Sequence, residues 1–297
     1  MVGTVAVVAH SGKTLQGGLG ALRVELAGVG VADPLWFEVP KSKLAPKRVG
    51  RALDAGAELV FVWGGDGMVQ RCVDAIAGSG SDATLAIVPA GTANLFASNL
   101  GIPKDIRASV ALGLHGPRRK LDVGRVNGEH FAVMAGAGLD ALMIRDADGT
   151  LKNRLGRVAY VITGAKNTRA PRVETRIRVD GEKWFAGKAG CVLVANVGKV
   201  MGDIAAFPDA RPDDGLLEIG VITAKGLWQW SRTLARAVTG EPQSSPFVQT
   251  ARGRKFDVRF ENPYPYELDG GDRKKVRRLR VKVRAAAVTV CVPAETS

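Results

Sequence analysis

The sequence predicts a three-layer α/β domain built on a parallel sheet, followed by an antiparallel β-sandwich domain. In the first half, short apolar runs alternate with amphipathic stretches, the pattern of strands joined by helical crossovers. After about residue 120 the periodicity changes to short strands separated by hairpin turns, such as Asn127-Gly128. We therefore expect an α/β domain at residues 1–120 and a β-sandwich domain at residues 121–297.

Apolar runs define the elements of the first half. The predicted strands are 4–9, 35–39, 58–63 and 85–88, each apolar enough to be buried on both faces of a parallel sheet. One predicted helix ends at about residue 27, and a short one ends at Asn99. The others span 48–55, 69–76 (closed by Gly78) and 104–114.

The second half is predicted to be mostly strands. These are 120–126, 129–135, 176–179, 183–187, 190–195, 216–222, 255–260, 276–284 and 286–292. Two helical stretches interrupt them, at about 151–167 and 225–238.

The composition is globular, with an excess of positive charge. The 297 residues include 42 Lys and Arg against 29 Asp and Glu, and the net charge of +13 favours an anionic partner. Aromatic residues make up only 6%, which argues against a protein that stacks nucleic-acid bases. The three cysteines fit neither a disulfide framework nor a zinc site, so we expect a reducing, cytoplasmic compartment. No apolar run approaches the roughly 18 residues of a membrane span.

The most informative stretch is the turn Gly64-Gly65-Asp66-Gly67. It follows the strand 58–63 and precedes an amphipathic helix, and this order of strand, glycine turn and helix N-terminus is suited to cradling phosphate. Because a carboxylate would repel phosphate, we interpret Asp66 as a group that orders magnesium or water for a nucleoside triphosphate. The alternative is a purely structural turn. The spacing matches neither the Rossmann fingerprint nor the P-loop.

Two further loops are expected at the same edge of the sheet, since ligands bind at the carboxyl ends of parallel strands. One is 10–13, which includes His10. The other is 89–94, in which Gly91 leaves the backbone accessible while Thr92 and Asn94 offer a hydroxyl and an amide. Thr92 is equally suited to cap the following helix.

Two acidic turns lie in the second half. Asp213-Asp214-Gly215 is interpreted either as an ordinary turn or as a divalent-cation loop that also uses carbonyl oxygens. The segment 266–272 contains Asp269 and, on spacing alone, is typical of a hairpin turn.

A basic run occupies residues 273–284, where eight of twelve residues are Lys or Arg. Alternation places Arg278, Arg280, Lys282 and Arg284 on one face of a strand, opposite apolar residues. This face is either simply solvated or a patch that docks on anionic lipid headgroups, or less readily on nucleic acid.

Five motifs together resemble the diacylglycerol kinase catalytic-domain family, the soluble bacterial lipid kinases related to sphingosine kinases and more distantly to NAD kinases. They are 64–67, 89–94, 135–140, 213–217 and 268–270, in the order and spacing of that family. The resemblance implies the two-domain fold expected above, with the active cleft between the domains.

The resemblance also implies roles for individual residues. ATP phosphates and the catalytic Mg²⁺ would be held by Gly64, Gly65, Asp66, Gly67, Met68, Gln70, Arg71, Gly91, Thr92 and Asn94. Asp269 would be the general base that takes the proton from a lipid hydroxyl. A second, structural Mg²⁺ would be bound by Asp214 with the carbonyl groups of Arg211 and Leu216. The reaction would be in-line transfer of the γ-phosphoryl group of ATP to a lipid alcohol.

Several positions depart from the family pattern. Met68 stands where the family usually has Thr, Gln70-Arg71 where it commonly has Asn-Glu, and Gly271 where it has an acid. Arg71 could supply a new phosphate contact. The alternatives are therefore an NAD-kinase-like enzyme with a soluble acceptor, or an inactive nucleotide- or lipid-binding regulatory protein.

The predicted partners are a lipid alcohol substrate and an anionic membrane. We expect peripheral binding at the inner membrane face through Lys152, Arg154, Lys166 and residues 273–284, with no nucleic-acid partner. Edge strands of the sandwich could pair into a homodimer. The sequence does not indicate which lipid is phosphorylated, because apolar cleft walls carry little readable specificity.

Overall fold

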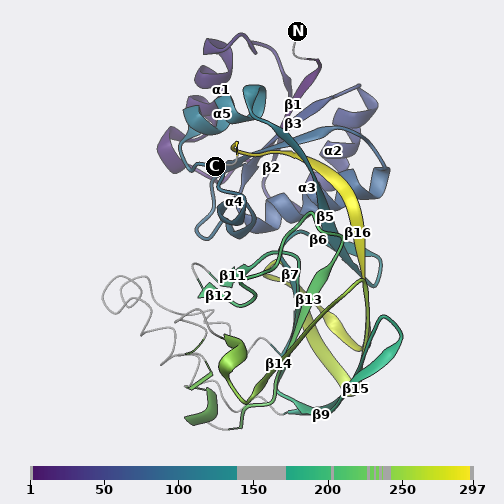
Figure 1. Ribbon diagram of the computed structural model, residues 1–297. Helices are drawn as coiled ribbons and strands as arrows, with labels where there is room; N and C mark the ends of the chain where they lie inside the picture. Colours follow the sequence, from purple (N-terminus) through teal and green to yellow (C-terminus); the bar gives the residue numbers. More distant parts are fainter. Residues whose placement is uncertain are drawn as a thin grey trace. The chain divides into compact units, whose positions relative to one another are not determined.

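The computed structural model describes residues 3–138, 172–201, 204–225, 228–230, 232–233, 236 and 242–294. The chain divides into two compact units (Figure 1). Unit 1 comprises Met1–Val123, Glu129–Ala132 and Arg284–Ser297, and unit 2 comprises Gly124–Gly128 and Val133–Val283. The first boundary between the units lies close to the expected division at residue 120. The last residues of the chain belong to unit 1 again, although the expected division placed them in the second domain.

Unit 1 is built on a parallel sheet of the four predicted strands. They are β1 (Val5–His10), β2 (Leu35–Val39), β3 (Leu59–Gly64) and β4 (Thr84–Pro89), in the spatial order β4-β3-β1-β2. The end of β16 (Gly271–Cys291) pairs in parallel with β4 through Thr289 and Val290. β3 is buried along its whole length, as its apolar sequence predicts.

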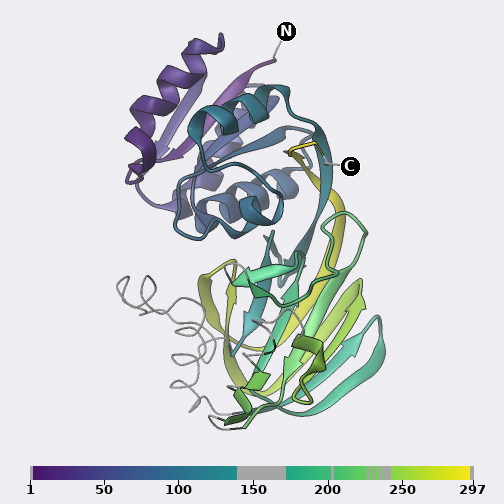
Figure 2. The same ribbon diagram turned by 60° about the vertical axis from the view of Figure 1, so that its left-hand side comes forward.

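Helices cover both faces of this sheet (Figure 1 and Figure 2). They are η1 (Leu15–Gly17), α1 (Gly18–Gly28), η2 (Ser42–Leu44), α2 (Ala45–Asp54), α3 (Asp66–Ser79), α4 (Leu95–Asn99) and α5 (Ile106–His115). Leu22 and Leu26 of α1 and Val110 of α5 share one apolar cluster with Phe61 of β3, whereas α2 and α3 pack together on the other side. The helix α3 begins at Asp66, three residues earlier than expected. It continues through Gly78 and is closed instead by Gly80 in the left-handed conformation (φ 71°).

Most strands of the second half lie in unit 2. After β5 (Arg118–Val126) and β6 (Glu129–Phe131) come β7 (Met134–Ala137), β8 (Val173–Val179), β9 (Glu182–Ala189), β10 (Cys191–Ala195), β11 (Lys199–Met201), β12 (Ile204–Ala205), β13 (Leu217–Ile222), β14 (Val248–Gly253), β15 (Lys255–Leu268) and β16, with the short helix η4 (Pro242–Ser244). The expected strand at 129–135 is divided between β6 and β7. The strand β14 was not predicted, because its sequence Val-Gln-Thr-Ala-Arg-Gly is not apolar enough.

The long strand β15 has different partners along its length. Its first part, Lys255–Phe260, pairs with β8 and β16, and β8 pairs with β9. Its last part, Tyr266–Leu268, pairs with β7. β7 pairs in turn with β10, β10 with β13, and β13 with β14. The register shifts between these parts, around Pro263, because a proline has no N–H to continue the ladder. All of these pairings are antiparallel, as expected for a sandwich.

Some expectations differ from the structure or lie outside it. Strands were expected at 276–284 and 286–292, but β16 runs through Ala286, which takes a positive φ of 49°. The expected helix 151–167, with Lys152, Arg154 and Lys166, lies outside the described residues, and only parts of 225–238 are described. Within the described part of the chain, no helix is long and apolar enough to cross a bilayer.

Candidate functional site

Two glycine turns touch at the carboxyl edge of the unit 1 sheet. β3 and β4 are neighbours in register, so the turn 64–67 and the turn 89–94 leave the sheet side by side. The backbone N–H of Ala90 donates to Gly64 O at 2.8 Å. A Cβ atom added to Gly91 would lie 2.5 Å from the Cα atom of Gly65. Both turns therefore need glycine, because their backbones pack against each other with no room for a side chain.

Asp66 joins the two turns. Its Oδ2 accepts a hydrogen bond from Asn94 N at 2.9 Å and its Oδ1 accepts one from Leu95 N at 2.5 Å. The carboxylate thus caps the start of α4, where helix N–H groups have no intrahelical partner. Burial raises the pKa of Asp66, although these backbone hydrogen bonds act in the opposite direction. The residue predicted to order magnesium or water therefore has a structural task as well.

The second turn is held by its own asparagine. Asn94 is buried and adopts the left-handed conformation (φ 51°). Its Oδ1 accepts from Gly91 N at 2.9 Å and its Nδ2 donates to Gly91 O at 2.8 Å. Asn94, and not Thr92, occupies the N-cap position of α4, and Thr92 is exposed at the tip of the turn. Its hydroxyl is therefore accessible to a ligand.

The start of α3 offers backbone N–H groups beside these turns. Gly65 is its N-cap residue and makes no side-chain capping bond. An α-helix N-terminus with uncapped N–H groups and a glycine approach binds anions. The side chain of Met68 does not point toward the start of α3 as a ligand of an anion would. It is 2% exposed, and a Cβ added to Gly64 would lie 2.5 Å from the Cβ of Met68.

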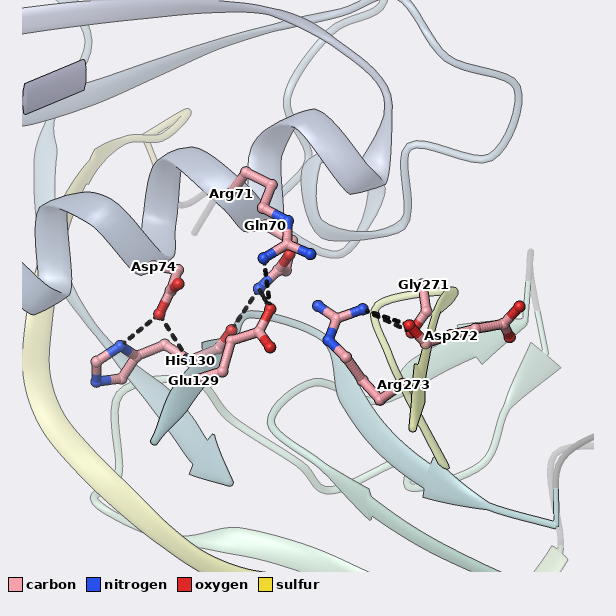
Figure 3. Close-up of polar contacts among 8 residues, drawn as sticks. All are labelled: Gln70, Arg71, Asp74, Glu129, His130, Gly271, Asp272 and Arg273. Atoms are coloured by element: carbon pink, nitrogen blue, oxygen red, sulfur yellow. Dashed lines mark hydrogen bonds and ion pairs between the residues drawn. The ribbon is translucent and has the colours of Figure 1, made fainter. Parts of the chain in front are cut away.

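The side of α3 that carries Gln70, Arg71 and Asp74 is bound to β6 (Figure 3). Gln70 Nε2 donates to His130 O at 2.7 Å, and Arg71 Nη1 pairs with Glu129 Oε1 at 2.7 Å. Asp74 Oδ1 accepts from His130 N at 2.8 Å and lies 2.9 Å from His130 Nδ1. Gln70 and Arg71 were predicted as cofactor ligands, and the structure places both in contacts within the protein.

In unit 2, Asp269 is a buried acid fixed by backbone groups. It sits in the turn between β15 and β16 with a positive φ of 45° and is 4% exposed. Its Oδ1 accepts from Val133 N at 2.9 Å and from Met134 N at 2.7 Å, while its own N–H donates to Met134 O at 3.0 Å. The backbone N–H groups of Val133, just before β7, and of Met134, its first residue, therefore orient the carboxylate.

The turn after Asp269 is closed by an arginine. Arg273 Nη1 donates to Gly271 O at 2.9 Å and to Asp272 O at 3.1 Å (Figure 3). A Cβ added to Gly271 would lie 2.9 Å from Arg273 Nη1. The glycine thus leaves space that the end of the arginine side chain uses.

Asp214, the predicted metal ligand, pairs with an arginine. Its Oδ1 accepts from Leu216 N at 3.0 Å, and its Oδ2 pairs with Arg252 Nη2. Arg252 Nε also lies 2.6 Å from Glu218 Oε1, directly across the β13–β14 ladder. Burial raises the pKa of Glu218, and Arg252 opposes this effect. Both oxygens of Asp214 therefore have partners, and a guanidinium supplies the positive charge that a cation would. The described residues do not form a ready magnesium site here, and the site at Arg211, Asp214 and Leu216 stays a prediction.

Comparison with known proteins decides the family. The model of the diacylglycerol kinase catalytic domain matches residues 35–126, and that of the YegS C-terminal NAD kinase beta sandwich-like domain matches residues 133–292. The chain is 32% identical over 252 residues to a Pseudomonas aeruginosa protein named "Probable lipid kinase YegS-like", covering 84% of this chain and 82% of the relative. The chain belongs to the diacylglycerol kinase catalytic-domain family. It is therefore a lipid kinase by family, as the five motifs predicted.

Further comparisons agree with this diacylglycerol kinase family assignment. A diacylglycerol kinase of Bacillus subtilis is 30% identical over 215 residues, which cover 72% of this chain and 71% of that one. The crystal structure of a diacylglycerol kinase from Bacillus anthracis superimposes with a TM-score of 0.78 at 22% identity, covering 97% and 96% of the two chains. An NAD kinase from Archaeoglobus fulgidus superimposes with a TM-score of 0.53 at 12% identity, covering 97% and 93%. These two structures bear on the fold alone, and they confirm the predicted fold class.

The departures from the diacylglycerol kinase pattern have structural explanations. The methionine at position 68 is packed into the interior, at 2% exposed. The base at Arg71 is neutralised by an acid that comes from β6, Glu129. Arg273 closes the turn in which Gly271 replaces an acid.

Sequence reasoning missed several polar residues of these sites. Glu129, His130 and Arg252 were not singled out, since each acts on a partner far along the chain. Asn196 is also buried, and its backbone N–H donates to the O atom of Val133 at 2.9 Å, the residue whose N–H binds Asp269. A signal for Asn196 was present, because it directly follows the apolar strand 191–195.

Proposed function

We propose that this chain is an ATP- and magnesium-dependent lipid kinase that transfers the γ-phosphoryl group to the hydroxyl of a diacylglycerol-like lipid at a membrane surface. The observation that carries the proposal is the buried carboxylate of Asp269, whose Oδ1 accepts hydrogen bonds from the backbone amides of Val133 and Met134. Family membership makes it a lipid kinase, and the acid supplies the group that the chemistry needs.

The glycine turns of unit 1 would bind the phosphates of ATP. Uncapped N–H groups of α3 and the exposed hydroxyl of Thr92 are donors, and the paired glycines keep side chains away from the backbone. Asn94 and Asp66 would act by fixing the shape of the turns. Magnesium would arrive with ATP and reduce the negative charge of its phosphates.

Asp269 would act as the general base. Its carboxylate would accept the proton of the lipid hydroxyl while the hydroxyl oxygen bonds to the γ-phosphorus and the bond to ADP breaks. No covalent enzyme intermediate is needed. Hydrogen bonds from Val133 N and Met134 N would hold the carboxylate in place, and its ionised form is the one that accepts a proton.

The test is a transfer assay with γ-labelled ATP, magnesium and purified protein. The acceptors are diacylglycerol, a sphingoid base, a phosphatidylinositol and a polyprenol in mixed micelles, with NAD as a soluble acceptor. We expect label in one lipid and none in NAD. Label in NAD alone would establish the NAD-kinase-like alternative. ATP-analogue binding without label in any acceptor would favour a regulatory binding protein.

A further inference from the structure

One face of the sheet β9-β8-β15-β16 in unit 2 is exposed and strongly basic. The side chains of Ile177, Val258, Leu279 and Val281 on its other face are all buried in the sandwich. The alternate residues point outward, as the sequence predicted for β16. We call the residues Arg176, Arg178, Arg259, Arg278, Arg280 and Lys282 the basic sheet face.

Strand register places these cations in rows. Arg259 of β15 lies directly opposite Arg176 of β8 on one side and Arg278 of β16 on the other. In the next row, Asp257 lies between Arg178 and Arg280. Beyond it, Lys282 lies opposite Lys255. Like charges directly across a ladder destabilise a sheet, so these positions oppose the stability of unit 2 when no anion is present.

Asp257 compensates only part of this charge. Its Oδ1 lies 2.6 Å from Arg278 Nε, and its Oδ2 lies 3.1 Å from Arg259 Nη2. Burial alone would raise the pKa of Asp257, but hydrogen bonds from Arg278 and Arg259 hold it below its ordinary value. The first two rows contain five arginines and this one aspartate. The face therefore keeps a large positive excess.

We propose that the basic sheet face docks unit 2 on a membrane that contains anionic lipid headgroups. The sheet displays its cations in rows over the adjacent strands β8, β15 and β16, and an anionic membrane offers a surface of negative charges. Proteins that bind single-stranded nucleic acid usually do so in a groove with aromatic side chains that stack on the bases. The basic sheet face is instead composed of Arg and Lys. The proposal rests on the proposed function in one respect, since a lipid kinase must meet its substrate at such a surface.

The experiment measures sedimentation of the full chain with vesicles in the absence of ATP. The vesicles are phosphatidylcholine alone, or phosphatidylcholine mixed with phosphatidylglycerol. The test variant carries Arg176→Gln, Arg280→Gln and Lys282→Gln. The control carries Lys47→Gln, Arg51→Gln and Lys104→Gln, three exposed positions of unit 1 that remove the same charge.

We expect the parent and the control to bind the mixed vesicles, and binding to weaken as salt rises. The test variant should bind about a hundredfold more weakly, at about 1 kcal/mol for each basic residue near an anionic surface. Its unfolding temperature should lie close to that of the parent, because Arg176→Gln and Lys282→Gln reduce repulsion across the ladder while Arg280→Gln removes a cation beside Asp257. The unfolding temperature also distinguishes a loss of vesicle binding from a loss of folding.

Three outcomes would overturn the proposal. One is equal binding of the test variant and the control, and another is equal binding of the parent to neutral and anionic vesicles. The third is tighter binding of the face to labelled duplex DNA than to vesicles at the same salt concentration. Because ATP is absent, this experiment tests vesicle binding independently of phosphoryl transfer. Loss of the docking proposal would therefore leave the proposed kinase activity standing, and the reverse also holds.

Discussion

Asp66 in unit 1 and Asp269 in unit 2 are both aspartates in glycine-containing turns, and both accept two backbone hydrogen bonds. In Asp66 the two bonds fall on different oxygens and tie the turn to the start of α4. In Asp269 both fall on Oδ1, and they orient the carboxyl group from one side. The same residue type in a similar sequence setting thus serves as a cap in one unit and, we propose, as the reacting group in the other.

The difference teaches how the two units divide the work. Unit 1 presents backbone: paired glycines and an uncapped helix, with one acid, Asp66, and one amide, Asn94, that shape the turns. Unit 2 presents a side chain, which backbone N–H groups of Val133 and Met134 hold in place. Substitutions should therefore affect unit 1 mainly through turn geometry and unit 2 mainly through chemistry.

The largest effect on stability is expected at the contact between the glycine turns. Gly91→Ala would place a Cβ 2.5 Å from the Cα of Gly65, a backbone atom that cannot rotate away, and 2.7 Å from Oδ1 of Asn94, which holds the turn. We expect a loss of about 3 kcal/mol in the free energy of unfolding, and weaker binding of ATP. Chemical denaturation and titration with an ATP analogue measure the two effects.

The matched control for this prediction is Gly78→Ala, within α3. A Cβ added there meets nothing within 4 Å, so alanine should stabilise the helix by about 0.5–1 kcal/mol. Equal effects of the two substitutions would show that the glycine contact does not shape the phosphate turn.

Next in size is the pair of acids that Arg252 joins. Arg252→Met leaves the carboxylates of Asp214 and Glu218 without their cation, and Glu218 is 7% exposed. We expect a loss of about 2 kcal/mol in unfolding free energy. If Arg252 replaces the structural magnesium, a chelator should leave the unfolding temperature of the parent unchanged. A clear decrease with the chelator, reversed by magnesium, would instead establish the predicted metal site.

A smaller, pH-dependent effect is expected from Asp74. Burial raises its pKa, but hydrogen bonds from His130 and the charges of His130 and Arg71 outweigh burial, so the pKa lies below 3.8. A lowered pKa stabilises the fold above 3.8, and this stabilisation is lost as the pH falls through the lower, folded-state value. Asp74→Asn should therefore cost about 1 kcal/mol near neutral pH and nothing at acidic pH. Denaturant unfolding at both pH values tests this, and a cost independent of pH would contradict it.

The smallest effect is expected from the pair Arg71–Glu129. Both side chains are partly exposed, so the pair should contribute about 0.5–1 kcal/mol. Arg71→Glu should destabilise unit 1 and Glu129→Arg should restore it, as a double-mutant cycle would show. Arg71→Gln should leave ATP affinity unchanged, because the guanidinium is already bound to Glu129. A large loss of ATP affinity would assign Arg71 to the phosphates instead.

Much of the fold could be predicted from local patterns. Four apolar runs gave the parallel sheet, and the Asn127-Gly128 turn and the alternation around Arg278 located hairpins and faces of the sandwich. The strand β14 lacked such a pattern. The division of β15 into two pairings depends on partners more than 70 residues away in β8, which periodicity does not reveal.

For the candidate site, the sequence predicted which polar residues are present better than it predicted what each one contacts. The turn at 64–67 is where expected, but that Asp66 caps a helix depends on Asn94, 28 residues later. Likewise Gln70 and Arg71 are polar residues beside the turn predicted to bind phosphate, and only the position of β6 shows that they contact His130 and Glu129. A sequence predicts which residues can bind a ligand, whereas the fold decides which of them already have partners.

The most direct test of the account is Asp269→Asn, measured beside the parent in the labelled-ATP assay. Asparagine accepts the same hydrogen bonds from Val133 and Met134 and tolerates a positive φ, so the unfolding temperature and the affinity for an ATP analogue should remain. It cannot accept the hydroxyl proton, so phosphoryl transfer should fall by about 10²–10⁴-fold. Transfer at the rate of the parent would show that Asp269 is not the base and that its buried carboxylate has a structural role, as that of Asp66 does.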